Sequence, residues 1–209
     1  MKHRKTIVTS VTLLLLFIVL AICVITGIAQ GFNDNLYGRV EHIINPTLTT
    51  AAIWTSNIGS AFFYLPMLAL LLIIPRTRVK IGLPVALTLA ASAIANAVLK
   101  AIFAVDRPDV NRLVHAGGFG FPSGHAMNAT VFFIFFAYLL ARHSSLKPAK
   151  IAAAAAVLIV LLIGFSRIYL GVHTVTDVLG GYLAGVVILL EAGGRLLRLQ
   201  EWKRTHNIE

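Results

Sequence analysis

The chain has 209 residues, of which 58% are hydrophobic and only 12% are charged. A typical soluble domain carries about 25% charged residues, so this composition excludes an ordinary soluble protein and indicates one integral membrane domain over residues 1–209. The net charge of +10 does not indicate a nucleic-acid partner, because the basic residues cluster in short segments between apolar runs.

Six apolar runs follow one another along the chain and predict an all-α bundle of six transmembrane helices, since about 20 residues cross a bilayer. The runs cover residues 6–28, 51–74, 81–105, 126–141, 151–165 and 178–197. The first run is longer than the roughly 7–15 apolar residues of a signal peptide, which is the alternative for that segment. Pro66 predicts a kink in the second run, and the polar residues 31–46 predict a loop.

Basic residues lie mainly on one side of this topology. The N-terminal tip, the turns at residues 76–80 and 142–150, and the C-terminal tail hold thirteen of the eighteen lysines and arginines. The positive-inside rule therefore predicts that both termini are cytoplasmic. Residues 100–125 and 166–177 then share the extracytoplasmic face of the cell membrane.

Two histidines and a carboxylate lie in these two outer segments. His173 and Asp177 are four residues apart, which on a helix places them on one face. A carboxylate that holds one imidazole nitrogen leaves the other nitrogen oriented and basic, so His173 is the candidate nucleophile. His125 has no carboxylate at helical spacing and is the candidate general acid.

Three cations accompany the histidines, and Lys100, Arg107 and Arg167 together predict a site for a multiply charged anion such as phosphate. Ser123 and Gly124 come just before the fourth run. Backbone N–H groups at such a helix N-terminus can seat a phosphate, and Ser123 is a natural N-cap.

The pattern Lys100-x6-Arg107-Pro108, Pro122-Ser123-Gly124-His125 and Ser166-Arg167-x5-His173-x3-Asp177 resembles the three-part signature of the type 2 phosphatidic acid phosphatase family. The resemblance implies a lipid phosphatase that needs no metal or other cofactor. It implies His173 as nucleophile with Asp177 as its partner, and His125 as acid. The residues it implies around the phosphate are Lys100, Arg107, Ser123, Gly124 and Arg167.

Several alternatives stay open at this point. His125, His173 and Asp177 could bind zinc, although three nearby cations oppose a divalent metal. The same phosphohistidine could serve a lipid phosphotransferase, and the cations alone could serve a non-enzymatic lipid carrier. A vanadate-dependent haloperoxidase has a similar anion site, but such enzymes are soluble.

The expected partners are a lipid phosphate and the bilayer, with no nucleic acid and no obligatory protein partner. The lipid itself stays open among phosphatidylglycerophosphate, phosphatidic acid and undecaprenyl diphosphate. Whether Arg112 and His115 contact its headgroup also stays open.

Overall fold

The computed structural model describes residues 2–143 and 149–206, and every regular element among them is helical. The elements are α1 (Lys2–Ile25), α2 (Gln30–Glu41), α3 (Pro46–Ile58), α4 (Ala61–Ile73), α5 (Pro75–Thr77), η1 (Arg78–Gly82), α6 (Leu83–Phe103), α7 (Gly124–Ala129), η2 (Thr130–Ile134), α8 (Phe135–His143), α9 (Ala149–Tyr169), α10 (Val175–Ile188), η3 (Leu189–Gly193) and α11 (Gly194–Thr205). The three η segments are single π-helical turns that continue directly into the neighbouring α-helices.

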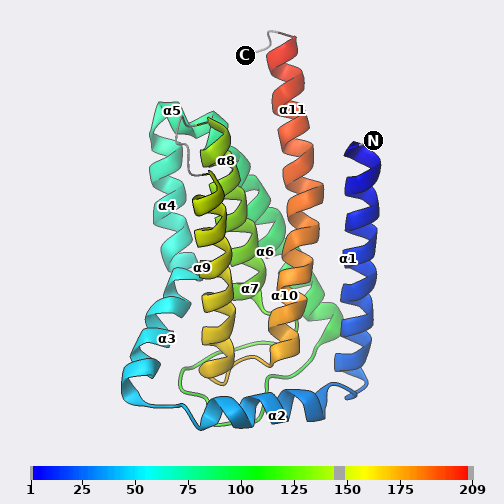
Figure 1. Ribbon diagram of the computed structural model, residues 1–209, viewed down its shortest axis with the longest axis vertical. Coiled ribbons are helices and arrows are strands. Elements are labelled where there is room, and N and C mark those ends of the chain that lie inside the picture. Colours follow the sequence, from blue (N-terminus) through cyan, green and yellow to red (C-terminus); the bar gives the residue numbers. More distant parts are fainter. Residues whose placement is uncertain (1, 144–148, 207–209) are drawn as a thin grey trace.

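Long helical columns run side by side, and α2 lies across one end of them (Figure 1). Within the described residues, five helical segments are long and apolar enough to cross a membrane, and the bent pair α3–α4 makes a sixth. The start of α1 and the end of α11 lie at the end of the bundle opposite α2 (Figure 1). The predicted all-α membrane architecture is therefore confirmed, with five to six spans.

Apolar side chains point both inward and outward. The largest buried cluster joins α4, α6, η2, α8 and α9, and the rings of Tyr64 and Phe132 lie 4.8 Å apart within it. Large apolar side chains on the outer surface, such as Phe62 and Ile73, are 87% and 72% exposed. A protein in water would not leave so many exposed, whereas a bilayer solvates them.

Residues 31–46 are not the loop that the sequence predicts, because Gln30–Glu41 forms α2. The helix is polar, and Asn33 is its one buried residue. A helix that lies across the end of the bundle needs no apolar run long enough to span a membrane. Hydropathy along the sequence therefore does not reveal α2.

Pro66, where the sequence predicts a kink, lies inside α4. A bend of 42° lies before this helix, between Ile58 and Ala61. At this break Gly59 and Ser60 donate backbone hydrogen bonds to Ser56 and Asn57, in place of regular helical bonds. The predicted basic turn at residues 142–150 falls largely on residues 144–148, outside the described part of the chain.

Candidate active site

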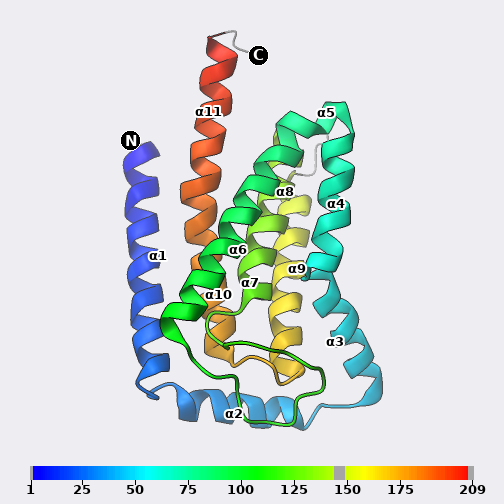
Figure 2. The same ribbon diagram turned by 180° about the vertical axis from the view of Figure 1, so that it is seen from behind.

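The two outer segments meet at the α2 end of the bundle, where the loop after α6 crosses beneath the other helices (Figure 2). Two backbone hydrogen bonds join them directly, from the Ser123 N–H to the Asp177 carbonyl at 2.9 Å and from the Leu113 N–H to the Leu170 carbonyl at 3.1 Å. Gly181, one turn after Asp177 in α10, allows this approach, because a Cβ there would lie 2.6 Å from the Ser123 carbonyl oxygen.

Arg167 and His173 come together through a tight reversal after α9. Gly171 has φ +68°, a left-handed conformation that favours glycine, and a Cβ there would lie 2.9 Å from the Asn111 carbonyl. The reversal lets the Arg167 carbonyl accept from the N–H groups of Val172 and His173, at 3.2 and 3.3 Å. The five residues between Arg167 and His173 are thus the last two residues of α9 and the three residues of the reversal.

The contact between His173 and Asp177 is present, but its geometry differs from the prediction. His173 precedes α10, whose N-cap is Thr174, so the two side chains do not stack on one helix face. Asp177 instead forms a capping box: its Oδ2 accepts from the Thr174 N–H at 2.9 Å and from His173 Nδ1 at 3.3 Å. The four-residue spacing arises because the third residue of the helix reaches back past its N-cap.

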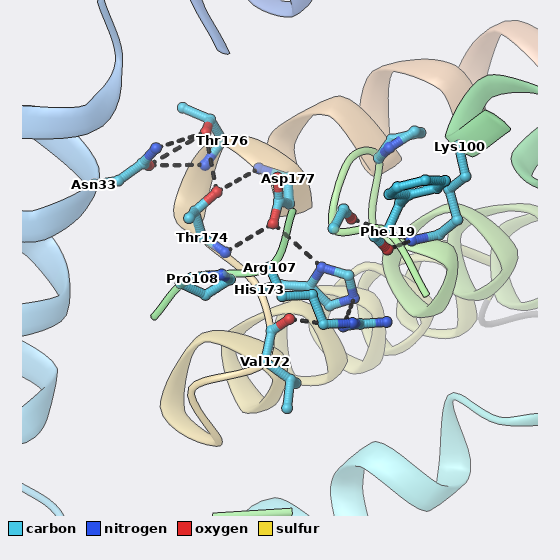
Figure 3. A network of polar contacts seen from close by, with 12 residues as sticks. Asn33, Lys100, Arg107, Pro108, Phe119, Val172, His173, Thr174, Thr176 and Asp177 are labelled. Atoms are coloured by element: carbon cyan, nitrogen blue, oxygen red, sulfur yellow. Dashed lines mark hydrogen bonds and ion pairs between the residues drawn. The ribbon is translucent and has the colours of Figure 1, made fainter. Parts of the chain in front are cut away.

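The other nitrogen of the His173 ring faces Arg107 (Figure 3). Arg107 Nη1 lies 3.2 Å from Nε2 and donates to the Val172 carbonyl at 2.7 Å. Its Nε and Nη2 donate to the carbonyls of Gly118 and Gly117, at 3.0 and 2.8 Å. An arginine cannot accept a hydrogen bond, so these contacts assign the lone pair to Nε2 and the proton to Nδ1.

Burial governs the charge of His173. The side chain is 2% exposed, and burial lowers its pKa to about 4, although the hydrogen bond and charge of Asp177 act in the opposite direction. At neutral pH the imidazole is therefore uncharged, and its contact with Asp177 is a hydrogen bond to a carboxylate rather than an ion pair.

The remaining predicted residues surround this histidine. Lys100 donates to the carbonyls of Phe119 and Gly120, and Arg167 donates to Ser56 on α3. Ser123, Gly124 and His125 follow one another at the start of α7, and the hydrogen bond from the Ser123 N–H to the Asp177 carbonyl holds this segment beside the others. The structure therefore brings the eight predicted site residues into one region.

Two polar atoms in this region are buried without a hydrogen-bond partner among the described residues: Ser123 Oγ and Arg167 Nε. Ser123 occupies the N-cap position of α7, as expected, but its side chain makes no capping bond. Buried polar groups normally have a partner, and an oxyanion would supply acceptors for both. Across the described residues, no group of three or more His, Cys, Asp or Glu side chains could hold a metal ion.

A cleft of about 480 Å³ leads from His125 into the apolar part of the bundle. It lies between α4, α6 and α7, and its deeper walls are apolar, including Leu65, Leu68 and Leu89. Alanines at positions 86, 90 and 93 of α6 leave space for it. The arrangement combines an anion site at a helix end with an adjoining apolar channel.

Known proteins resemble this chain in sequence and in fold. The PAP2 superfamily matches residues 81–193, which include every predicted site residue. Phosphatidylglycerophosphatase B of Bacillus subtilis is 34% identical over 88% of this chain and 93% of its own length. The chain belongs to the PAP2 superfamily.

Other PAP2 relatives extend the comparison. An undecaprenyl-diphosphatase of Sulfolobus acidocaldarius is 29% identical over 90% of this chain and 94% of its own length. The crystal structure of a transmembrane PAP2-type phosphatidylglycerolphosphate phosphatase from Bacillus subtilis has a TM-score of 0.84, with 33% identity over 91% of this chain and 96% of that one. LpxE of Aquifex aeolicus has a TM-score of 0.61, with 28% identity over 80% and 95%.

Sequence reasoning missed several residues that shape the site. Ser56 and Gly59 come from the second span, Asn33 from α2, and Thr174 and Thr176 from the start of α10. The Thr174-x-x-Asp177 pattern is a capping-box signal and could have been recognised. Asn33 has no local signal, because its partner is 143 residues away in the chain.

Proposed function

We propose that this PAP2 lipid phosphatase cleaves the terminal phosphate from a membrane lipid through a phosphohistidine on His173, without a metal ion. The observation that carries the proposal is the orientation of the His173 ring, with Nδ1 at Asp177 and the Nε2 lone pair facing Arg107. Such a ring can attack phosphorus without first losing a proton.

In the first step, Nε2 forms a bond to phosphorus while the bond from phosphorus to the lipid oxygen breaks, and His125 gives a proton to the leaving oxygen. In the second step, His125 takes a proton from water, the water oxygen bonds to phosphorus, and the P–N bond breaks to release phosphate. Lys100, Arg107 and Arg167 stabilise the charge on the non-bridging oxygens. Backbone N–H groups at Ser123 and Gly124 supply further donors.

The site acts at the extracytoplasmic face of the cell membrane, and both termini are cytoplasmic. Support comes from the distribution of charge, because the basic segment of α5 and η1 and the basic α11 lie at the end of the bundle opposite α2 (Figure 1). The positive-inside rule assigns that end to the cytoplasm.

The lipid reaches the site from the side, with its hydrocarbon chain in the cleft between α4 and α6. His125 lines the start of this cleft, so a proton donor stands where the phosphate joins the apolar part of the substrate. A site at a helix end allows the charged head to stay near water while the chain stays in the membrane.

Phosphatidylglycerophosphate is the substrate that we propose, because a Bacillus subtilis relative that aligns over most of this chain, in sequence and in crystal structure, is named for it. Undecaprenyl diphosphate is the second candidate, because a relative of similar coverage is named for that activity. Neither substrate requires a cofactor, a nucleic acid or an obligatory protein partner at this site.

The test is phosphate release by the purified protein, in detergent and with a metal chelator, from phosphatidylglycerophosphate, phosphatidic acid and undecaprenyl diphosphate. We expect the highest kcat/KM on phosphatidylglycerophosphate, and loss of release on all three lipids in His173→Ala. Turnover that stops with chelator would contradict the metal-free mechanism. Transfer of phosphate to an acceptor instead of water would favour the phosphotransferase, and lipid transport that survives His173→Ala but not Arg167→Ala would favour the carrier.

A further inference from the structure

One side chain of α2 enters the site from outside the signature segments. Asn33 is only 6% exposed, although it belongs to a polar helix at the end of the bundle. Its Nδ2 donates to Thr176 Oγ1 at 2.9 Å, and its Oδ1 accepts from the Thr176 N–H and from Thr176 Oγ1, each at 3.2 Å (Figure 3). Both polar groups of the amide are therefore directed at one residue.

The hydrogen bonds continue from Thr176 to His173. Thr176 Oγ1 lies 3.1 Å from Thr174 Oγ1, which accepts from the Asp177 N–H at 3.2 Å. Asp177 Oδ2 in turn accepts from the Thr174 N–H and from His173 Nδ1. Each link in this series is buried or partly buried, so an unbroken set of hydrogen bonds connects α2 to the imidazole (Figure 3).

Capping alone does not explain Asn33. Thr174 already forms the capping box of α10 with Asp177. Water could satisfy the remaining Thr176 N–H, because a pocket of about 260 Å³ borders this point and is lined by Asn33, Gln30 and Thr174. Asn33 adds a constraint on orientation. Because its amide bonds both the N–H and the hydroxyl of Thr176, it fixes the first turn of α10 relative to α2.

We propose that Asn33 is a positioning residue, which fixes the capping box of α10 and thereby the carboxylate that orients the imidazole of His173. The proposal rests on the proposed function, because it takes His173 as the nucleophile. Misplacement of a reacting group by about 1 Å can reduce a rate about 100-fold. Loss of the amide should therefore lower kcat, because Asp177 and His173 are less well aligned, and leave lipid binding intact.

The test compares kcat and KM on a lipid phosphate for Asn33→Leu, which keeps the approximate volume and removes both hydrogen-bonding groups. Folded protein is counted by the amplitude of its thermal unfolding transition, so that unfolded protein does not lower the measured kcat. We expect kcat to fall about 10- to 100-fold with KM changed by less than about twofold. Gln30→Ala is the matched control, because Gln30 lies on the same helix and lines the same pocket but bonds Asp34 of its own helix.

Thr176 supplies a second test that does not depend on the folding of Asn33→Leu. Thr176→Val should lower kcat in the same way, and Thr176→Ser, which restores the hydroxyl, should recover most of it. Combining Thr176→Val with Asn33→Leu should lower kcat little further than the more damaging single change, because both act through one network.

The proposal would be overturned if Asn33→Leu kept the wild-type kcat per active site, if it lost no more than Gln30→Ala, or if Thr176→Ser failed to recover activity. A failure of the proposed function itself appears differently: turnover would then survive in His173→Ala.

Discussion

Asp177→Asn should reduce turnover only moderately, for a reason that lies in the capping box. Asp177 Oδ2 accepts from two donors, the Thr174 N–H at 2.9 Å and His173 Nδ1 at 3.3 Å. If the NH₂ group of the substituted amide took this place, it would face the Thr174 N–H donor. The amide oxygen must therefore stay there, where it also accepts from His173 Nδ1. The ring keeps its tautomer, and only the negative charge is lost.

The size of the effect follows from that loss. A hydrogen bond to a charged group contributes about 1.5–3 kcal/mol and a neutral one about 0.5–1.5 kcal/mol, so the difference is about 1–1.5 kcal/mol. Since about 1.4 kcal/mol corresponds to a factor of ten, kcat should fall about 5- to 12-fold. Asp177→Ala removes the acceptor as well, which frees the ring to change tautomer and leaves the Thr174 N–H without its partner. There we expect a loss of at least about 1,000-fold in kcat, and about 1–3 kcal/mol of stability.

The assay is phosphate release from phosphatidylglycerophosphate by both variants, with thermal unfolding midpoints measured on the same samples. The reasoning is refuted if Asp177→Asn is as inactive as Asp177→Ala while its unfolding midpoint is unchanged. The amide would then have turned its NH₂ group toward His173, and the capping box would not control the orientation.

Three further predictions concern the nucleophile, the acid and the packing of α10. Burial lowers the pKa of His173 to about 4, so protonation of the nucleophile should reduce kcat/KM only near pH 4, once the ionisation of the lipid phosphate has been corrected for. A fall of kcat/KM near pH 6.5, the ordinary pKa of histidine, would contradict this. His125→Ala should slow release of the lipid alcohol in the first turnover about 100- to 10,000-fold, but slow release of p-nitrophenol from p-nitrophenyl phosphate in the first turnover far less, because that leaving group needs no proton; equal losses in this step would exclude His125 as the acid. Gly181→Ala should lower both activity and the unfolding midpoint, at a cost of about 1–3 kcal/mol, because its Cβ would lie 2.6 Å from the Ser123 carbonyl oxygen. Gly31→Ala is its control, since nothing lies within 4 Å of a Cβ there, and an equal loss in that variant would contradict the packing argument.

The membership of the site could be predicted from sequence because ionisable side chains stand out in an apolar chain. Lys100, Arg107 and Arg167 each cost free energy at a membrane helix end, so their presence together in the outer segments predicts a ligand of opposite charge. The same reasoning paired His125 with His173 before any geometry was known. The charge and chemical type of the side chains indicated these residues, and their spacing along the sequence indicated the family.

The geometry of the site could not be predicted in the same way. The spacing of His173 and Asp177 fits a helix face, yet the structure realises it through a helix cap. A spacing of four residues is compatible with both arrangements, and only the capping pattern that begins at Thr174 distinguishes them. The role of Asn33 depends on where α2 packs, which is a tertiary fact with no counterpart in the local sequence.

The break in the second span illustrates why tertiary position outweighs local propensity. Pro66 lacks a backbone N–H, but the bend occurs at Gly59 and Ser60 instead. Non-helical backbone at membrane depth is tolerated only where protein buries it or a cavity adjoins it, and both residues line the cleft that leads from His125. The turn before the break also places Ser56 against Arg167. The bend between α3 and α4 thus coincides with the cleft and with the contact between Ser56 and Arg167, which local propensity does not encode.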